Sequence, residues 1–207
     1  MKPVAVVTGG SGGIGSAVRQ ELGRRGFETW SLSPSGGVDA ADEAQVEAFF
    51  ARLPRLDALV HAAAVLIPAP FAEVTAEQWD RTLEAGLRSA FLTTRSAFRM
   101  MPGRGGSIVM VSSLAGVAGA EKFPGTAAYV AAKSAMAGLT EALAVEGRPL
   151  GIRVNAVSPG AVRTRMLDLS PAPSEPALEP SAVAGVVAWL ASPDSSPLSG
   201  ANLRMDP

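Results

Sequence analysis

Cysteine is absent from this chain of 207 residues, and histidine occurs only once, as His61. Without cysteine the chain has no disulfides, no thiolate nucleophile and no cysteine-ligated metal site. A single histidine also excludes a metal site built from several imidazoles. We therefore expect no bound metal, and chemistry carried by side-chain acids and bases or by an organic cofactor.

Charge is scarce as well, because only 18% of the residues are charged, against a usual value of about 25%. The 18 basic and 19 acidic residues give a net charge of −1, so we expect no nucleic-acid partner. No basic amphipathic run indicates a membrane surface. No apolar run approaches the ~18 residues of a spanning helix, and no leader-like segment opens the chain. The expected location is therefore cytoplasmic.

Short apolar runs alternate with longer helical patterns along the chain. Helices that separate buried apolar strands indicate right-handed βαβ units. We therefore predict an α/β fold, with a Rossmann-type doubly wound, mainly parallel sheet and helices on both faces. Residues 1–207 are expected to form a single domain. The predicted strands are 3–7, 29–33, 56–64, 107–112, 153–157 and 201–205, and the predicted helices are 14–25, 42–53, 75–101, 127–146 and 181–191.

A glycine-rich turn joins the first predicted strand to the first predicted helix. Within it, Gly10, Gly12 and Gly15 satisfy the pattern G-x-G-x-x-G. Backbone N–H groups at a helix N-terminus attract phosphate, and glycines let the ligand approach the main chain closely. The turn therefore predicts a dinucleotide site. A tight strand–helix connection without a ligand remains the alternative.

The same turn also contains G-x-S-x-G around Ser11, the pattern of a hydrolase nucleophile elbow. The order serine, aspartate, histidine is available through Ser11, Asp39 or Asp57, and His61. Only one strand precedes Ser11, however, and such an elbow normally follows several strands, one of which supplies an oxyanion loop. We therefore favour the dinucleotide site over the hydrolase.

The only tyrosine, Tyr129, stands four residues before Lys133, one of three lysines in the chain. Positions i and i+4 share a helix face, so we expect the ammonium to lie beside the phenol. A nearby cation favours the phenolate, which predicts a lowered pKa and a role in proton transfer. An ordinary helix pair is the alternative. Ser113, just after the strand 107–112, is placed to hold a substrate oxygen.

In order and approximate spacing, these motifs, together with Asn155 and the Pro159–Gly160 pair, resemble the short-chain dehydrogenase/reductase family. The closest resemblance is to short carbonyl or ketoacyl reductases, and it covers nearly the whole chain. It implies a nicotinamide cofactor and hydride transfer between that cofactor and a carbonyl or alcohol. By this resemblance Tyr129 is the general acid or base. Lys133 lowers the tyrosine's pKa and holds the nicotinamide ribose, and Ser113 positions the substrate oxygen.

The resemblance also implies the cofactor-binding residues. The second predicted strand ends at Ser33 without the acidic residue that would bind the ribose hydroxyls of NAD and repel a 2′-phosphate. We therefore favour NADP(H) over NAD(H), although the turn itself holds no arginine. By resemblance Asp39 flanks the adenine, and a helix N-cap is its alternative role. The expected residues are Gly9, Ser11, Gly13, Ile14, Gly15, Ser33, Ser35, Asp39, Ala40, Ala62, Ala63, Tyr129, Lys133, Pro159, Gly160, Val162 and Thr164.

Two positions depart from the family pattern. Residues 61–64 read His-Ala-Ala-Ala where the family usually has Asn-Asn-Ala-Gly, and we interpret His61 as structural, with backbone partners in reach. Gly86 stands where the family has a catalytic asparagine. We expect Gly86 to permit a local kink that leaves a backbone carbonyl for a water. The proton relay would then be reduced or rerouted.

Two segments are expected to border the substrate pocket. One is a short, proline-rich substrate loop at 166–180, and the other is an insertion at 121–123. Arg163 and Arg165 either meet an anionic group or are solvated.

The predicted function is that of an oxidoreductase acting on a small carbonyl or alcohol with NADP(H). The alternative is a catalytically weak nucleotide-binding sensor or assembly protein on the same fold. We also expect a homodimer or homotetramer formed through helices 76–101 and 127–146, because the family often assembles through them.

Overall fold

Six strands form one parallel sheet in the computed structural model, which describes residues 1–206. The strand order is β2-β1-β3-β4-β5-β6, and each neighbouring pair is parallel. The predicted Rossmann-type sheet is thus confirmed. The strands are β1 (Val4–Thr8), β2 (Glu28–Leu32), β3 (Ala58–His61), β4 (Gly106–Val111), β5 (Ile152–Pro159) and β6 (Asn202–Met205).

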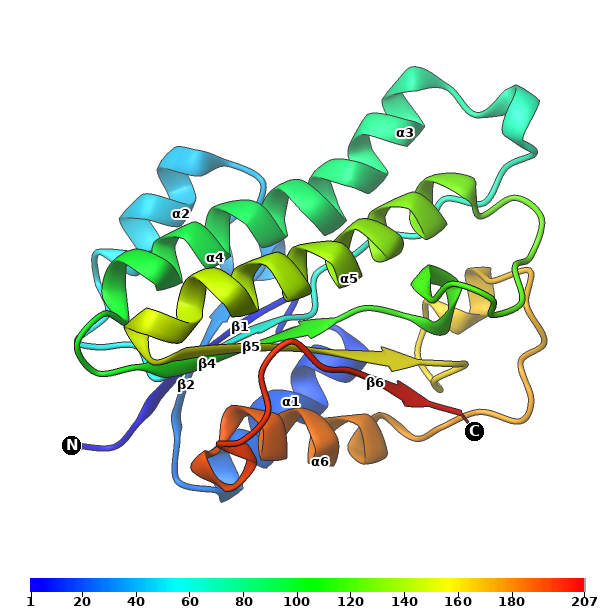
Figure 1. Ribbon diagram of the computed structural model, residues 1–207. Helices are drawn as coiled ribbons and strands as arrows, with labels where there is room; N and C mark the ends of the chain where they lie inside the picture. Colours follow the sequence, from blue (N-terminus) through cyan, green and yellow to red (C-terminus); the bar gives the residue numbers. More distant parts are fainter. Residues whose placement is uncertain (207) are drawn as a thin grey trace.

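Helices cover both faces of the sheet (Figure 1). Successive strand residues point to opposite faces, so Val6 and Leu59 join one core cluster while Val7 and Val60 join the other. Burial on both faces explains why the central strands β1, β3 and β4 are largely apolar, whereas the edge strands β2 and β6 are partly exposed. One face carries α1 (Gly13–Arg24) and α6 (Pro180–Ala191), and the other carries α2 (Glu43–Phe50), α3 (Ala76–Leu83), α4 (Ser89–Met100) and α5 (Ala127–Gly147).

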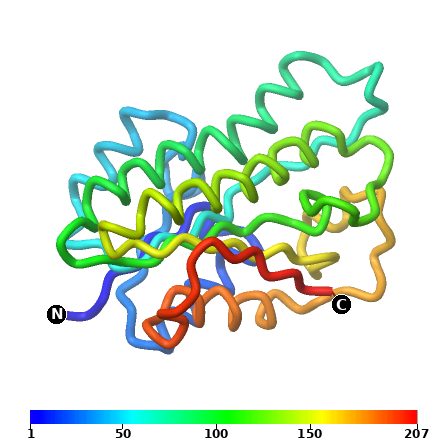
Figure 2. Tube along the Cα trace, in the orientation of Figure 1, coloured from blue at the N-terminus to red at the C-terminus, as the bar shows by residue number. Residues whose placement is uncertain are grey.

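The helix predicted over 75–101 is interrupted by a π-helical turn, η3 (Glu84–Arg88), between α3 and α4. The Cα tube in Figure 2 nevertheless continues from α3 into α4 as one long helical path. Thr75 and Gln78 form a capping box at its start. A π turn inserts an extra residue and so disturbs the regular backbone ladder. The disturbance falls at Gly86, where the kink was expected.

The connection between β2 and α2 is short. A single 3-10 turn, η1 (Pro34–Gly36), follows the strand before the chain enters α2. The cap of α2 is Asp42, whose Oδ1 accepts the N–H of Gln45 at 3.0 Å. The alternative role given to Asp39, that of the N-cap, is therefore wrong. Among residues 1–206, no helix combines the length and the apolar character needed to cross a membrane.

Candidate active site

A cavity of about 550 Å³ opens at the carboxyl edge of the sheet, where the loops after β4 and β5 meet. The carboxyl ends of parallel strands lie on one edge, so residues far apart in the sequence converge there. The structure brings seven of the predicted site residues to this cavity. They are Ile14, Ser113, Tyr129, Pro159, Gly160, Val162 and Thr164.

The glycine turn is packed so tightly that side chains are excluded at several positions. Gly9 has a φ of +62°, which favours glycine. A Cβ at Gly15 would overlap the Gly9 carbonyl, and a Cβ at Gly13 would overlap the side chain of Thr164. The helix α1 that follows has no side-chain cap and no acidic residue in its first turn. Its first N–H groups are therefore available to an anion such as a pyrophosphate.

One basic residue near this turn was missed by the sequence reasoning. Arg19 extends over Gly10 toward β2, because a Cβ on Gly10 would lie 2.8 Å from the Arg19 Cδ and 2.6 Å from the Ser31 Oγ. Within residues 1–206 the buried Arg19 Nε has no hydrogen-bond partner. The hydroxyls of Ser31, Ser33 and Ser35 follow one another at 3.3 and 3.2 Å. The role of Arg19 could have been predicted from its position in the sequence, because it stands one helical turn after the glycine turn.

The other predicted nucleotide-binding residues lie nearby in different environments. Asp39 is exposed, and its Oδ1 accepts the Ala41 N–H at 2.9 Å. Ala40 is buried in the core cluster beneath α2 and α4. At the end of β3, the N–H groups of Ala62 and Ala63 donate to the Thr8 hydroxyl at 3.1 and 3.2 Å. These two residues are thereby fixed beside the glycine turn.

Tyr129 is held in the cavity wall by the first turn of α5. Burial raises the pKa of its phenol above the ordinary value of 10, while a hydrogen bond with Ser113 acts in the lowering direction. The expected lowering of this pKa by the lysine is therefore wrong. Lys133 Nζ lies 5.6 Å from the centroid of the tyrosine ring, over the face of the ring. The phenol is protonated at neutral pH and can act as an acid.

Lys133 is only 3% exposed. Burial lowers the pKa of its ammonium to about 8. Nζ donates to the Val111 carbonyl at 2.7 Å, which leaves two of its three N–H donors for a ligand. The loop after β4 is fixed to the same helix, because the Ser112 hydroxyl donates to the Lys133 carbonyl at 2.9 Å. A Cβ on Gly116 would also lie 2.5 Å from the Lys133 carbonyl carbon. These contacts position Ser113 relative to Tyr129.

His61 is completely buried, with both ring nitrogens engaged. Nδ1 lies 2.9 Å from the Thr8 hydroxyl, and Nε2 lies 3.0 Å from the Gly86 carbonyl. The Thr8 hydroxyl already accepts two backbone N–H groups, so its proton points to Nδ1 and Nε2 carries the imidazole proton. Burial, and secondly the charge of Lys133, lower the pKa of His61 to about 3, so the ring is neutral.

The expectation of a backbone partner for His61 is thus confirmed, since the ring donates to the Gly86 carbonyl. The carbonyl that was expected to bind a water is thus engaged by the imidazole. One hydrogen bond thus joins His61 and Gly86, the two positions that depart from the family pattern.

The geometry also excludes the hydrolase alternative. Ser11 is exposed in the glycine turn, whereas both nitrogens of His61 are engaged with Thr8 and Gly86. Asp57 precedes β3 and binds the N–H of Val4 at the start of β1, which is the opposite edge of the sheet. Nor is any group of three His, Asp or Glu side chains in the described part of the chain arranged to hold a metal ion.

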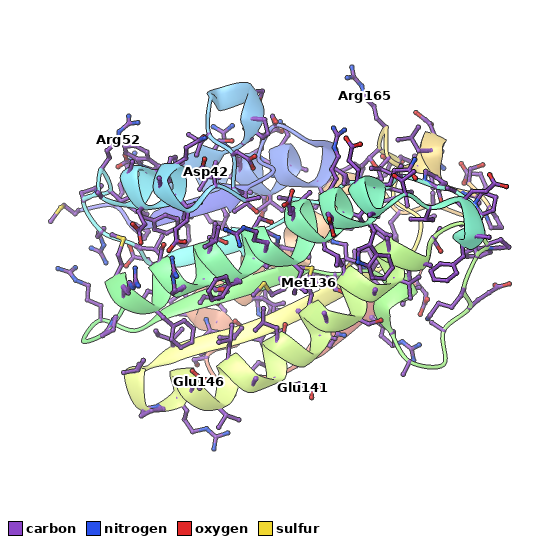
Figure 3. The ribbon with its side chains drawn as sticks, turned by 90° about the horizontal axis from the view of Figure 1, so that it is seen from above. Asp42, Arg52, Met136, Glu141, Glu146 and Arg165 are labelled. Carbon is purple, nitrogen blue, oxygen red and sulfur yellow. The ribbon has the colours of Figure 1, made fainter. Side chains whose placement is uncertain are left out.

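Both expected border segments reach the cavity. The loop 166–180 contributes Met166, Leu167 and several later residues, and the insertion contributes Glu121 and Phe123. The two arginines near the loop do not line the cavity. Arg163 pairs with Glu175 and Glu179 at 2.6 and 2.8 Å, and Figure 3 shows Arg165 extending away from the molecule.

A glycine turn at the carboxyl edge of a parallel sheet, beside a tyrosine and a buried lysine, defines a Rossmann-type nucleotide-binding oxidoreductase. Residues 33–207 match a family profile described as enoyl-(acyl carrier protein) reductase. Relatives over the full chain are also oxidoreductases. The chain belongs to the short-chain dehydrogenase/reductase family.

The relatives align with this chain along nearly the whole of both sequences. Cyclopentanol dehydrogenase from Comamonas sp. (strain NCIMB 9872) is 34% identical over 242 residues, covering 98% of this chain and 95% of the relative. The uncharacterized oxidoreductase YohF of Escherichia coli (strain K12) is 31% identical over 243 residues, covering 100% and 95%. The structure of 3-ketoacyl-(acyl-carrier-protein) reductase from Brucella melitensis complexed with NADH superimposes with a TM-score of 0.89 at 26% identity, covering 99% and 96%.

The neutral state of His61 predicts a pH dependence of stability. On unfolding, the imidazole regains its ordinary pKa of 6.5, whereas in the fold it stays unprotonated down to about pH 3. Unfolding therefore takes up a proton between these values, and stability is lost as the pH falls. Urea unfolding from pH 6 to pH 4 should show the wild type losing about 1.4 kcal/mol per pH unit more than His61→Gln. Parallel curves for the two proteins would contradict this account.

Proposed function

We propose that the protein is an NADP(H)-preferring carbonyl reductase in which Tyr129 is the general acid, assisted by Lys133 and Ser113. The observation that carries this proposal is the cavity itself. Tyr129 and Ser113 line it together with the segment 159–164, and the ammonium of Lys133 lies over the tyrosine ring. A protonated phenol next to an oxygen-binding hydroxyl is the arrangement that carbonyl reduction requires.

The residues at the carboxyl edge of the sheet fit an extended dinucleotide. The glycine turn and the N-terminus of α1 would hold the pyrophosphate. Arg19, with the hydroxyls of Ser33 and Ser35, would hold a 2′-phosphate, since an unpaired buried guanidinium nitrogen and hydroxyls suit that anion. The remaining proposed contacts are Asp39 and Ala40 at the adenine, Ala62, Ala63 and Lys133 at the ribose, and Pro159, Gly160, Val162 and Thr164 at the nicotinamide.

When bound, NADPH supplies the hydride that a substrate carbonyl carbon accepts. The Ser113 hydroxyl donates a hydrogen bond to the carbonyl oxygen and orients the substrate. The phenol of Tyr129 transfers its proton to that oxygen, so that the products are an alcohol and the oxidised cofactor. The tyrosine is left as a phenolate, which the Lys133 ammonium stabilises until a proton returns. In the direction of alcohol oxidation the same groups act in reverse.

The cavity supports a small carbonyl or alcohol as the substrate. Its wall is largely apolar, with Leu66, Leu114 and Phe123 among the lining residues, and the polar groups that can fix an oxygen gather at Tyr129 and Ser113. The relationship to cyclopentanol dehydrogenase supports the same class of substrate.

Tyr129→Phe tests the catalytic proposal against the alternative of a nucleotide sensor. Because the substitution removes only the phenolic proton, NADPH oxidation with a panel of ketones and aldehydes should fall about 10²- to 10⁴-fold. Binding of NADPH, measured by its fluorescence, should stay within about threefold of the wild type. A wild-type protein that binds NADPH tightly but turns over no member of the panel would favour the sensor, as would turnover unaffected by the substitution.

Arg19→Ala tests the cofactor preference. Loss of a charge-assisted contact should weaken NADPH binding about tenfold or more and leave NADH binding almost unchanged. Arg24→Ala is the matched control, because it removes the same charge from the last turn of the same helix. Isothermal titration of both nucleotides against the three proteins gives the comparison. If Arg19→Ala weakens both nucleotides equally, or neither of them, Arg19 does not read the 2′-phosphate.

A homo-oligomer formed through α4 and α5 is part of the proposal. Both helices carry exposed apolar side chains, with Phe91 47% and Val145 69% exposed. Covering such side chains favours association. Light scattering that finds only a monomer at micromolar concentration would overturn this assembly.

A further inference from the structure

The π turn η3 touches α5 next to the buried lysine. A Cβ added to Gly86 would lie 3.4 Å from the Cβ of Ala132, the residue before Lys133. Gly86 itself is buried. The charge of Lys133 is also felt at His61, where it acts to lower the pKa of the imidazole. The imidazole and the π turn, joined through the Gly86 carbonyl, therefore lie in the same buried region as the part of α5 that carries Lys133.

The carbonyl of Gly86 in the π turn is engaged by His61. It accepts the Nε2–H of the imidazole at 3.0 Å. The Ser89 hydroxyl lies 3.3 Å away, but it donates its single proton to the nearer Ala85 carbonyl at 2.6 Å. The imidazole is therefore the side chain that covers this buried carbonyl.

Lys133 has little other compensation for its burial. Its Nζ contacts the ring of Tyr129 on its own helix and the Val111 carbonyl on β4, and its charge is felt at the neutral imidazole of His61 on β3. The loop after β4 approaches the backbone and Cβ of Lys133 through Gly116. No carboxylate within residues 1–206 forms an ion pair with Lys133.

We propose that His61 is a positioning residue for Lys133: by occupying the Gly86 carbonyl it holds the π turn against α5 and keeps water away from the ammonium. The catalytic meaning of this role rests on the proposed function. The ammonium of a lysine that is shielded from water loses its proton near neutral pH. Its proton can therefore return readily to the Tyr129 phenolate that is left after each reduction.

Two substitutions separate the contacts of the imidazole. In His61→Gln, the longer side chain places its amide N–H near the position of Nε2, within reach of the Gly86 carbonyl. In His61→Asn, the shorter amide lies near the position of Nδ1, so it can meet Thr8 but does not reach Gly86. Both variants place an uncharged amide in the same buried site, and they differ in the contact on which the proposal depends.

The three lysines make a direct test possible. In protein labelled with ¹³C at lysine Cε, NMR titration resolves Lys133 from Lys2 and Lys122, which are exposed and serve as internal references. The wild-type Lys133 should titrate near 8. In His61→Asn, water admitted at the freed carbonyl should raise the midpoint by about one pH unit toward the ordinary lysine value. In His61→Gln the midpoint should remain within about 0.3 units of the wild type.

Equal midpoints in the wild type and His61→Asn would overturn the proposal, as would equal shifts in the two variants. Circular dichroism over the same pH range confirms that each variant is folded, and a merely structural histidine would change stability without moving the lysine midpoint. The titration needs no substrate, so it can succeed even if no carbonyl is reduced. If turnover is found, the alkaline limb of kcat should shift with the Lys133 midpoint.

Discussion

An ammonium buried without a carboxylate partner is the constraint on which the site depends. Removing a charge from water is costly, and within residues 1–206 Lys133 is compensated only by one carbonyl and by the face of an aromatic ring. This arrangement keeps the lysine poised to lose or regain its proton near pH 8. It also leaves two N–H donors for a ligand. A buried charge that lowers stability is typical of sites where the charged group takes part in chemistry. The burial of Lys133 therefore favours an enzyme over a passive nucleotide-binding protein.

The surrounding fold fixes the two loops that lie near this lysine. The serine loop after β4 is fixed to α5 by Ser112 and Gly116, and the glycine turn is fixed to β3 through Thr8 and His61. The glycine turn and the loop after β4, the two parts of the proposed site, are therefore each held in place by buried hydrogen bonds. A hydrogen bond joins His61 to the Gly86 carbonyl at the position where the family pattern has a side-chain amide and where a water was expected.

Much of the fold could be predicted from the sequence, because apolar runs of five or six residues separated by helical periodicity indicate a parallel sheet. The convergence of Ser113 and Tyr129 followed from their positions at the carboxyl edge. Three features depend on distances that a linear sequence does not contain. First, Lys133 lies over the ring of Tyr129, and burial determines the direction of the phenol's pKa shift. Second, the Gly86 carbonyl accepts a hydrogen bond from an imidazole. Third, Arg19 extends back across the glycine turn to β2.

The most direct test of this account is a crystal structure of the protein with bound NADP⁺. The account predicts that the nicotinamide lies between the phenol of Tyr129 and the segment 159–164, with Lys133 bonded to the adjoining ribose and the 2′-phosphate on Arg19. A nicotinamide bound far from Tyr129, with the phenol facing empty cavity, would contradict the proposed chemistry even if the pyrophosphate occupied the glycine turn.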